Sequence, residues 1–427
     1  MTASSTPRAS ALPQNNHTSG VMDRIGRRLV HRTLRGLQEG RLILIEGEQE
    51  YSFGPGRDAD ARVRVLQPKF HTSMAFGGTL GAAEAYMQGF WETDDLPGLI
   101  QLLMRNQQAL NRMNGGWGRL TTPAHRLIHA LRRNHRRGSR RNIRAHYDLS
   151  NEFFALFLDP TMMYSCAVFP TPDSTLEEAS VHKIERICRK LDLQADDHVL
   201  EIGTGWGGWA IHAARHYGCR ITTTTISAAQ ARLARERIRD AGLADRIQVL
   251  ETDYRELTGA FDKLVSIEMI EAVGHQYYDA YFRQCSALLK PHGLMALQAI
   301  TIADWAYRQH VNTVDFIKRY IFPGGCLPSV TAITDAVARA TDLRLVHLED
   351  IGPHYVRTLQ EWRRRFHDRL ASVRTMGFPE EFVRMWEYYL GYCEAGFAQR
   401  YISDAQLLLA KPGNRRPALV PALEVRS

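Results

Sequence analysis

The sequence has few features that would indicate metal binding, secretion or insertion into a membrane. Its six cysteines are scattered without a Cys-x-x-Cys pair, which argues against a cysteine zinc site and against a dense disulfide framework. No stretch approaches the roughly 18 apolar residues that a spanning helix requires, and the N-terminus has no continuous apolar segment of a signal peptide. We therefore expect no metal site, a reducing cytoplasmic environment and no membrane crossing.

What the sequence does have is an ordinary globular composition with one strongly basic segment. Of the 427 residues, 44% are hydrophobic and 23% are charged, which is enough for one large domain or two smaller ones. The formal net charge is +8, and residues 131–144 hold seven arginines and no acidic residue. This segment favours a polyanion or an anionic membrane surface as a partner, and a solvated linker is the alternative.

The pattern of residues divides the chain into four segments. Residues 1–20 are rich in Ser, Thr, Asn and Pro and are predicted to be disordered. Residues 21–114 mix strand-like runs with two helical patterns, which predicts a small α+β accessory domain for lipid or dimer contact. Residues 115–144 form a basic linker, and residues 145–415 form the predicted catalytic domain.

Strand-like and helical patterns alternate through the third quarter of the chain. This alternation predicts a doubly wound parallel sheet, whose ligand binds outside the carboxyl ends of the strands. A further strand is predicted near the C-terminus, at residues 404–412. The strand-like runs of the alternating part are residues 198–203, 219–226, 246–253, 263–269 and 293–300.

A glycine-rich loop, EIGTGWGGWA, follows the first of these strands. Gly203, Gly205 and Gly207 have the G-x-G-x-G spacing, and glycine lets the backbone approach a ligand closely. The second strand ends in TTTTIS without the acid that a dinucleotide ribose requires, so the S-adenosylmethionine (SAM) methyltransferase fold is favoured. Asp253 and Tyr254 would offer adenine an acceptor and a ring. A purely structural glycine turn is the alternative.

Five longer stretches carry a more specific pattern: HYDLSNEFFALFLDPTMMYSCAVF (146–169), VLEIGTGWGGWA, TISAAQ (225–230), IEMIEAVG and KRYIFPGGCLPS (318–329). They resemble, in the same order, stretches of the cyclopropane fatty acid synthases and their relatives, the mycolic acid cyclopropane synthases. The resemblance implies an α/β, Rossmann-like SAM-dependent methyltransferase fold. The N-terminal segment resembles the additional α+β domain of the longer bacterial synthases.

The resemblance also implies a reaction on lipids. The methyl group of SAM would be added across the cis double bond of an unsaturated phospholipid acyl chain, and bound bicarbonate would remove a proton to close a cyclopropane ring. A lipid methyltransferase that produces a methyl-branched or methylene chain is the alternative. An RNA-binding methyltransferase and a non-catalytic lipid-binding protein are weaker alternatives. We expect peripheral association with the anionic inner face of the membrane, no nucleic-acid partner and a possible homodimer.

Site residues follow from the resemblance, position by position. Cys166, Glu271 and Tyr320 match the residues that hold bicarbonate, and Gln298 stands where the best known bacterial enzyme has a histidine. Glutamine can donate a hydrogen bond to the anion but cannot titrate. Cys393 matches a cysteine that has been considered catalytic, although the chemistry favours a structural role. The expected SAM contacts are Tyr164, Ser165, Gly203, Gly205, Thr225, Ile226, Gln230, Asp253 and Tyr254.

The stretch SIEMIEAVG, residues 266–274, places Glu268 and Glu271 in an apolar run, where a carboxylate is costly to bury without a partner. We expect Glu271 to accept the hydroxyl hydrogen of bicarbonate and to orient this base. Glu268 would be an outer partner that points elsewhere. The alternatives are a structural salt bridge for Glu271, a small buried apolar role for Cys166 and a packed core position for Tyr320.

Overall fold

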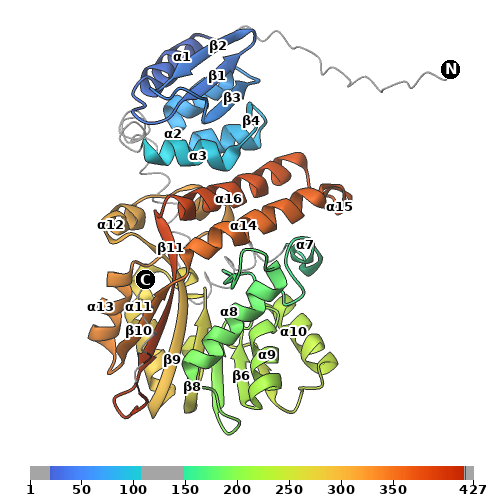
Figure 1. Cartoon of the computed structure of the whole chain (residues 1–427), viewed down its shortest axis with the longest axis vertical. Helices are drawn as coiled ribbons and strands as arrows, with labels where there is room; N and C mark the ends of the chain where they lie inside the picture. The colour runs from blue at the N-terminus through green and yellow to red at the C-terminus, as the bar shows by residue number, and fades with distance from the viewer. Residues whose placement is uncertain (1–19, 107–148, 418, 420–427) are drawn as a thin grey trace, which may run out of the picture.

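The computed structural model describes residues 20–106, 149–417 and 419, which form two packed units (Figure 1). The N-terminal unit lies at one end of the molecule, next to a layer of long C-terminal helices, and a large sheet lies beyond that layer. The basic segment at 131–144 lies outside the described residues, as do the first nineteen. The predictions about these segments stay predictions.

The N-terminal unit is a four-stranded sheet with three helices, in strand order β2-β1-β3-β4. Strands β1 and β3 are parallel, and the other two pairs are antiparallel. Asp95 caps helix α3 by accepting the N–H of Gly98 at 3.0 Å. The elements are α1 (Val21–Leu34), β1 (Leu42–Glu46), β2 (Gln49–Phe53), β3 (Ala61–Val65), α2 (Lys69–Met87), β4 (Trp91–Thr93) and α3 (Leu96–Arg105).

The larger unit is built on a seven-stranded sheet in the order β10-β11-β9-β8-β5-β6-β7. The five strands from β5 to β9 are mutually parallel, but β11 lies antiparallel between β9 and β10. The α/β prediction is confirmed with two differences. An apolar run predicts a buried strand but not its direction, and the strand at Arg344–Asp350 was not predicted. The strands are β5 (His198–Ile202), β6 (Arg220–Thr224), β7 (Ile247–Leu250), β8 (Phe261–Ile267), β9 (Leu289–Ile302), β10 (Arg344–Asp350) and β11 (Ile402–Ala410).

Helices cover both faces of this sheet. Apolar residues of α8, α9 and α10 form the core on one face, and those of α11 and α13 form it on the other (Figure 1). Among the described helices, none combines the length and apolarity needed to span a bilayer. The helices are α7 (Asn151–Ala155), α8 (Leu176–Leu191), α9 (Gly208–Tyr217), α10 (Ala228–Asp240), α11 (Tyr278–Ala287), α12 (Asp304–Asn312), α13 (Val330–Ala340), α14 (Gly352–Asp368), α15 (Leu370–Thr375) and α16 (Glu380–Ala398), with short 3-10 turns η2 (Tyr254–Glu256), η3 (Ile270–Ala272) and η4 (His275–Tyr277) and a π-helical turn η5 (Ile317–Ile321).

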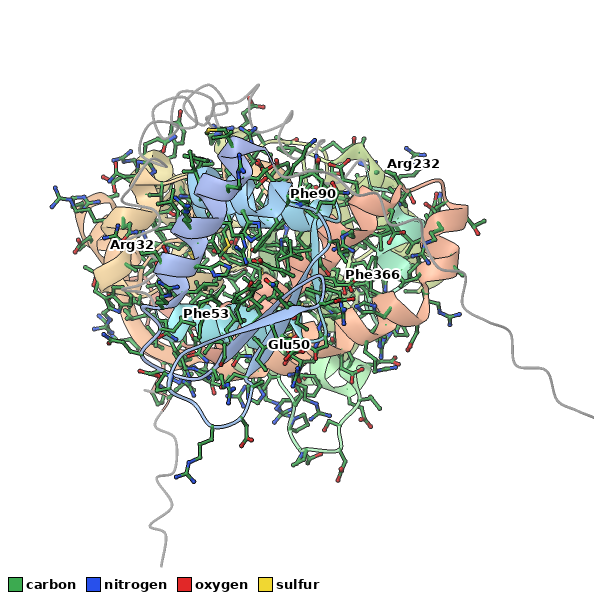
Figure 2. All side chains as sticks on the ribbon, turned by 90° about the horizontal axis from the view of Figure 1, so that it is seen from above. Arg32, Glu50, Phe53, Phe90, Arg232 and Phe366 are labelled. Carbon is green, nitrogen blue, oxygen red and sulfur yellow. The ribbon has the colours of Figure 1, made fainter. Side chains whose placement is uncertain are left out.

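Helix α16 joins the two units. One hydrophobic core contains residues of α2 and α3 together with Trp386 and its neighbours on α16. Arg384 donates hydrogen bonds to the carbonyls of Tyr86 and Trp91, and the Tyr86 hydroxyl donates to Glu387 at 2.8 Å. Viewed from the N-terminal end, the N-terminal unit overlies the larger one (Figure 2). The two units therefore form one continuous structure rather than two separate bodies.

Candidate active site

A cavity of about 340 Å³ lies at the carboxyl ends of the parallel strands. Its wall includes Gly203 after β5, Thr225 after β6 and Glu268 after β8. Helix α16 contributes Cys393, and α3 of the N-terminal unit contributes Met104. The cavity thus occupies the position predicted for a ligand of this sheet, and both units line it.

All nine residues expected to contact SAM line the cavity. Gly203 and Gly205 have φ angles of 104° and 51°, in the region that favours glycine. A Cβ atom at Gly205 would meet no other atom within 4 Å, so it would project into the open space of the cavity. The glycine loop therefore presents bare backbone to the ligand. The nine residues are Tyr164, Ser165, Gly203, Gly205, Thr225, Ile226, Gln230, Asp253 and Tyr254.

Buried polar side chains at the ends of β6 and β7 face this part of the cavity. Gln230 is buried, and its Oε1 accepts a hydrogen bond from the hydroxyl of Thr225 at 3.0 Å. Asp253 is also buried, and Arg255 donates to its two oxygens at 2.8 and 2.6 Å. Arg255 neutralises the carboxylate and holds it in place at this end of the cavity.

Glu268 lies at the centre of a second, buried hydrogen-bond cluster in the cavity wall. Its Oε1 accepts the backbone N–H of Cys166 and the side-chain amide of Gln298, both at 2.8 Å. Its Oε2 accepts the hydroxyl of Tyr355 at 2.7 Å. Glu268 has a φ of 46°, a conformation that costs a non-glycine residue roughly 1 kcal/mol or more. The expectation that Glu268 points elsewhere is wrong: the turn after β8 directs it into this cluster.

Asp404 of β11 lies on the far side of the same cluster. Its Oδ2 accepts the amide of Gln298 at 2.9 Å, and its Oδ1 is buried with no hydrogen-bond partner among the described residues. Burial, and then the negative charge of Glu268, raise the pKa of Asp404 well above its ordinary value. The shift favours the neutral form of Asp404 beside the carboxylate of Glu268.

Glu271 lies on the turn η3, three residues after Glu268, and lines the same cavity. Its Oε1 accepts the N–H of Ile300 at 2.5 Å, and its Oε2 is buried with no partner in the described part of the chain. Burial, and then the charge of Glu268, raise the pKa of Glu271 to about 8. At neutral pH this side chain is mostly protonated. It offers a hydrogen to a ligand, whereas the sequence analysis expected an acceptor.

Tyr320 is not where the resemblance predicted. Its hydroxyl donates to Glu84 of α2 at 2.6 Å, and the residue does not line the cavity. Burial, and then Glu84, raise the pKa of Tyr320 to about 12. The π-helical turn η5 directs the ring toward the N-terminal unit, a direction that the following Pro-Gly-Gly sequence did not reveal. The phenol that contacts Glu268 comes instead from Tyr355 of α14.

The other three residues predicted for catalysis take different positions. Cys166 is buried outside the cavity lining, and its thiol donates to the carbonyls of Ala167 and Ile351. Gln298 is likewise buried behind Glu268 and does not line the cavity. Cys393 does line it, and burial raises the pKa of its thiol above the ordinary value. A protonated thiol is a weak nucleophile, so the chemistry of Cys393 favours a structural role.

The sequence analysis missed three residues of this cluster: Tyr355, Asp404 and Lys183. Asp404 had a signal, because it stands in the apolar run at 404–412. Lys183 is buried, and its Nζ donates to the hydroxyl of Ser165 at 2.8 Å. Burial lowers the pKa of this lysine, although nearby carboxylates favour its charged form. Neither Lys183 nor Tyr355 had a distinguishing sequence pattern.

Comparison with known proteins agrees with this geometry. A family model described as mycolic acid cyclopropane synthetase matches residues 134–407. The chain belongs to this family. It is 42% identical to the tuberculostearic acid methyltransferase UfaA1 of Mycobacterium tuberculosis, over 79% of this chain and 80% of that protein. It is 36% identical to the cyclopropane-fatty-acyl-phospholipid synthase of Escherichia coli K12, over 83% of this chain and 88% of that protein.

Solved structures of the mycolic acid cyclopropane synthetase family have the same fold. The cyclopropane synthase MmaA2 of Mycobacterium tuberculosis aligns with a TM-score of 0.60 and 32% identity, over 64% of this chain and 98% of that one. The synthase CmaA1, in a complex with SAH and CTAB, aligns equally well at 31% identity. The predicted family, fold and SAM-dependent methyltransferase class are therefore confirmed. This chain is a SAM-dependent enzyme of lipid modification.

The cavity of this family member fits SAM. SAM supplies an electrophilic methyl group when it is bound. The glycine loop at Gly203 and Gly205 leaves room for the ligand, and Gln230 and Asp253 offer buried polar atoms for its ribose and adenine. Glu268 lines the same cavity, which places a carboxylate in the compartment where the methyl group is delivered.

Proposed function

We propose that this protein transfers the methyl group of SAM to the double bond of an unsaturated acyl chain in a phospholipid, and that Glu268 then removes a proton. The observation that carries the proposal is the partly buried carboxylate of Glu268, held by three hydrogen-bond donors in the wall of the SAM cavity. An alkene has no proton that must be removed before methyl transfer. A base is therefore required only after the transfer, when the acyl chain carries a positive charge.

Glu268 takes the role that the sequence analysis gave to bicarbonate. The anion was expected to be held by Cys166, Glu271 and Tyr320, with Gln298 at a fourth position. Two of these residues, Cys166 and Gln298, donate to Glu268. A third donor, Tyr355, completes the cluster. With these donors engaged, a small anion would lack the contacts expected to bind it. An attached carboxylate has the charge and the basic oxygen that the reaction needs, so bicarbonate is not required.

The groups around Glu268 suit a reaction through a cation. Burial and the neighbouring carboxylate of Glu268 raise the pKa of Glu271 to about 8 and also raise that of Asp404, which favours the neutral forms of both side chains. A single fixed negative charge stabilises a developing positive charge in a poorly solvated cavity. Aromatic rings that line the cavity add the negative faces of their π systems and exclude water. They include Tyr164, Trp206, Phe322, Tyr355, Tyr389, Tyr392 and Phe397.

We infer that the product is a methylene-bearing acyl chain. After methyl transfer to one alkene carbon, a hydride shifts from that carbon to its neighbour, and the positive charge moves to the methylated carbon. Loss of a proton from the new methyl group to Glu268 then forms a double bond between this carbon and the chain, which is a methylene (=CH₂) branch. The step needs no oxidant or reductant. Two observations support it: Glu268 already accepts the hydrogen bonds of Cys166 and Gln298, and the 42% identical relative is named a methyltransferase.

Cyclopropane formation is the second candidate. It follows if Glu268 removes the methyl proton before the hydride shifts, because the electron pair of the C–H bond then closes a three-membered ring. The support for it is the 36% identity with a cyclopropane-fatty-acyl-phospholipid synthase over 83% of the chain. The same base serves both products, so the timing of the hydride shift decides between them.

The test is to incubate the protein with SAM that carries a ¹³C methyl group and with vesicles of unsaturated phospholipid, and to release the acyl chains for analysis. Both products gain the mass of one methylene group. We expect ¹³C signals of a terminal alkene carbon, whereas high-field ring signals would establish the cyclopropane instead. The reaction is repeated in buffer freed of carbonate. Activity that requires added bicarbonate would contradict the role of Glu268.

The lipid substrate also implies contact with a membrane, and we propose that α12 contributes to it. Trp305 of this helix is 71% exposed, and its ring contacts that of Tyr401, which lines the cavity. Arg308 is exposed on the same helix, and tryptophan beside a basic residue is typical of membrane interfaces. Trp305→Ser should weaken sedimentation with anionic vesicles at low salt. Unchanged sedimentation would leave the arginine segment at 131–144 as the remaining candidate.

A further inference from the structure

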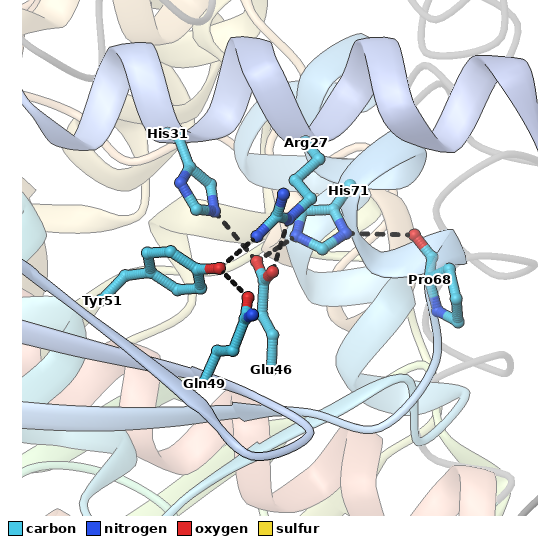
Figure 3. Close-up of polar contacts among 7 residues, drawn as sticks. All are labelled: Arg27, His31, Glu46, Gln49, Tyr51, Pro68 and His71. Carbon is cyan, nitrogen blue, oxygen red and sulfur yellow. Dashed lines mark hydrogen bonds and ion pairs between the residues drawn. The ribbon is translucent and has the colours of Figure 1, made fainter. Parts of the chain in front are cut away.

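A cluster of ionisable side chains lies in the N-terminal unit, away from the cavity (Figure 3). His31 of α1 and His71 of α2 approach Glu46 at the end of β1. The Nε2 atoms of the two histidines lie 2.9 and 2.8 Å from the same carboxylate oxygen, Oε1. Both histidines are buried, and Arg27 donates to the other oxygen, Oε2, at 2.5 Å.

Three side chains converge on the carboxylate of Glu46. The Nδ1 of His71 faces the carbonyl oxygen of Pro68 at 3.3 Å, and the Nε2 of the same ring faces Glu46. Both imidazole rings therefore present a nitrogen to the same carboxylate oxygen.

A metal ion would account for the convergence of these three side chains. We propose that His31, Glu46 and His71 bind a divalent transition-metal ion of the Zn²⁺ class. Their ligand atoms all lie within 4.8 Å of one another, so small side-chain movements would bring them to bonds of about 2.0 to 2.2 Å to a common ion. A hydrogen bond from the other ring nitrogen to a backbone carbonyl is the usual support of a metal-binding histidine, and Pro68 provides it for His71.

The neighbours of the three ligands define the kind of site. Arg27 binds Oε2 and the hydroxyl of Tyr51, so it would fix the orientation of the Glu46 carboxylate and leave Oε1 to the metal. Two imidazoles and one carboxylate favour Zn²⁺ or a similar ion over Mg²⁺ and Ca²⁺, which prefer oxygen ligands. Three protein ligands leave a fourth position for water or an anion.

The metal would connect three elements of the N-terminal unit. His31 lies 15 residues before Glu46, and His71 lies 25 residues after it, so the site forms only when α1, β1 and α2 are packed together. The ion would therefore stabilise this unit and, through α2, the surface that packs on α16. The sequence analysis expected no metal because it examined cysteine spacing, and these ligands are histidines and a glutamate without a compact motif.

The test uses the full-length protein, stripped with a chelator and titrated with Co²⁺ and Zn²⁺. Co²⁺ bound by imidazole and carboxylate absorbs visible light, so it reports the ligands directly. We expect one equivalent of Co²⁺ to bind, to be displaced by Zn²⁺, and Zn²⁺ to raise the melting temperature. His71→Gln should weaken Co²⁺ binding about tenfold or more. Glu46→Gln provides a second variant in case His71→Gln does not fold.

The matched control is His216→Gln. His212 and His216 lie one turn apart on α9, with ring centroids 4.4 Å apart, so they form a histidine pair far along the chain from the proposed site. We expect this control to keep the one equivalent of Co²⁺ and its absorption. Equal binding by the wild type and by folded His71→Gln, or binding lost only in His216→Gln, would overturn the proposal. Absence of any Co²⁺ absorption in the wild type would do so as well.

Discussion

Glu46 in the N-terminal unit and Glu268 in the cavity wall are two largely buried carboxylates with opposite surroundings. Glu46 is approached by an arginine and two histidines, whereas Glu268 accepts hydrogen bonds from a backbone N–H, an amide and a phenol. Burial alone would raise the pKa of Glu46, but its hydrogen bonds lower the pKa to about 2. The number of contacts is the same, and the charge of the partners differs.

This difference shows how the chain assigns a structural role to one acid and a chemical role to the other. Arg27 places a positive charge next to Glu46 within its own cluster. Uncharged donors make the hydrogen bonds to Glu268, and the nearby Lys183 donates to Ser165 and not to this carboxylate. The raised pKa values of Glu271 and Asp404 are the visible effect of the charge of Glu268, added to their burial.

The largest expected effect comes from removing the charge of Glu268 and of Glu46 in separate variants. Glu268→Gln should lower kcat about a thousandfold, because the amide keeps the shape of the side chain but cannot take a proton. SAM affinity, measured by calorimetry, should stay nearly unchanged. Glu46→Gln should keep its activity at temperatures where it is folded. If both variants lose the same activity, the distinction between the two carboxylates is wrong.

The effect of the Glu268 charge on its neighbour Glu271 can be measured through the pH dependence of stability. The folded-state pKa of Glu271, about 8, lies above the ordinary 4.5, so the stability linked to it is present below pH 4.5 and is lost as the pH rises through 8. Glu271→Gln should therefore gain stability relative to the wild type as the pH rises from 4.5 to 8, and the gain should reach about 5 kcal/mol at pH 9. Urea unfolding at several pH values measures this. The exposed Glu380→Gln should show no such gain, and a flat difference for Glu271→Gln would contradict the assignment.

The effect of Glu46 on stability should be smaller. Glu46→Gln removes the acceptor of three donors, and we expect the free energy of unfolding to fall by about 2 kcal/mol, because Arg27 is partly exposed and regains water. Urea unfolding with chelator present isolates this effect from any bound metal. A variant as stable as the wild type would mean that the cluster around Glu46 does not hold the N-terminal unit together.

Two tyrosines give the finest test. Tyr355→Phe removes a donor of Glu268 and should lower kcat about tenfold, whereas Tyr320→Phe removes a contact with Glu84 and should change kcat less than about threefold. Steady-state kinetics with the same vesicle substrate compares them. A larger loss of kcat for Tyr320→Phe would restore the position that the resemblance gave it.

Much of the fold and of the SAM site could be predicted from the sequence. The glycine loop and the strand ends are local patterns, and all nine predicted contacts line the cavity. The N-terminal helix α1 and strand β2 were not predicted, because basic residues interrupt the apolar pattern of α1 and β2 is largely polar. The direction of β11 could not be predicted either, since pairing depends on the whole sheet.

The acid cluster could be predicted only in part. The sequence correctly drew attention to the carboxylates in SIEMIEAVG, but it assigned the site to Glu271 and an outer place to Glu268. The φ of 46° at Glu268 reverses the direction of that side chain, and no pattern in the sequence reveals it. Tyr355 reaches the cluster from 87 residues away, so only the folded chain brings it there.

The unusual backbone at position 268 has one last consequence, for chemical rescue. A left-handed conformation suits glycine better than any other residue, so Glu268→Gly should relieve strain while it opens a hole lined by the donors of Cys166, Gln298 and Tyr355. Formate or bicarbonate added to such a variant would find a ready-made receptor. The dissolved anion, at millimolar concentration, would then accept the proton that the side chain of Glu268 accepts in the wild type.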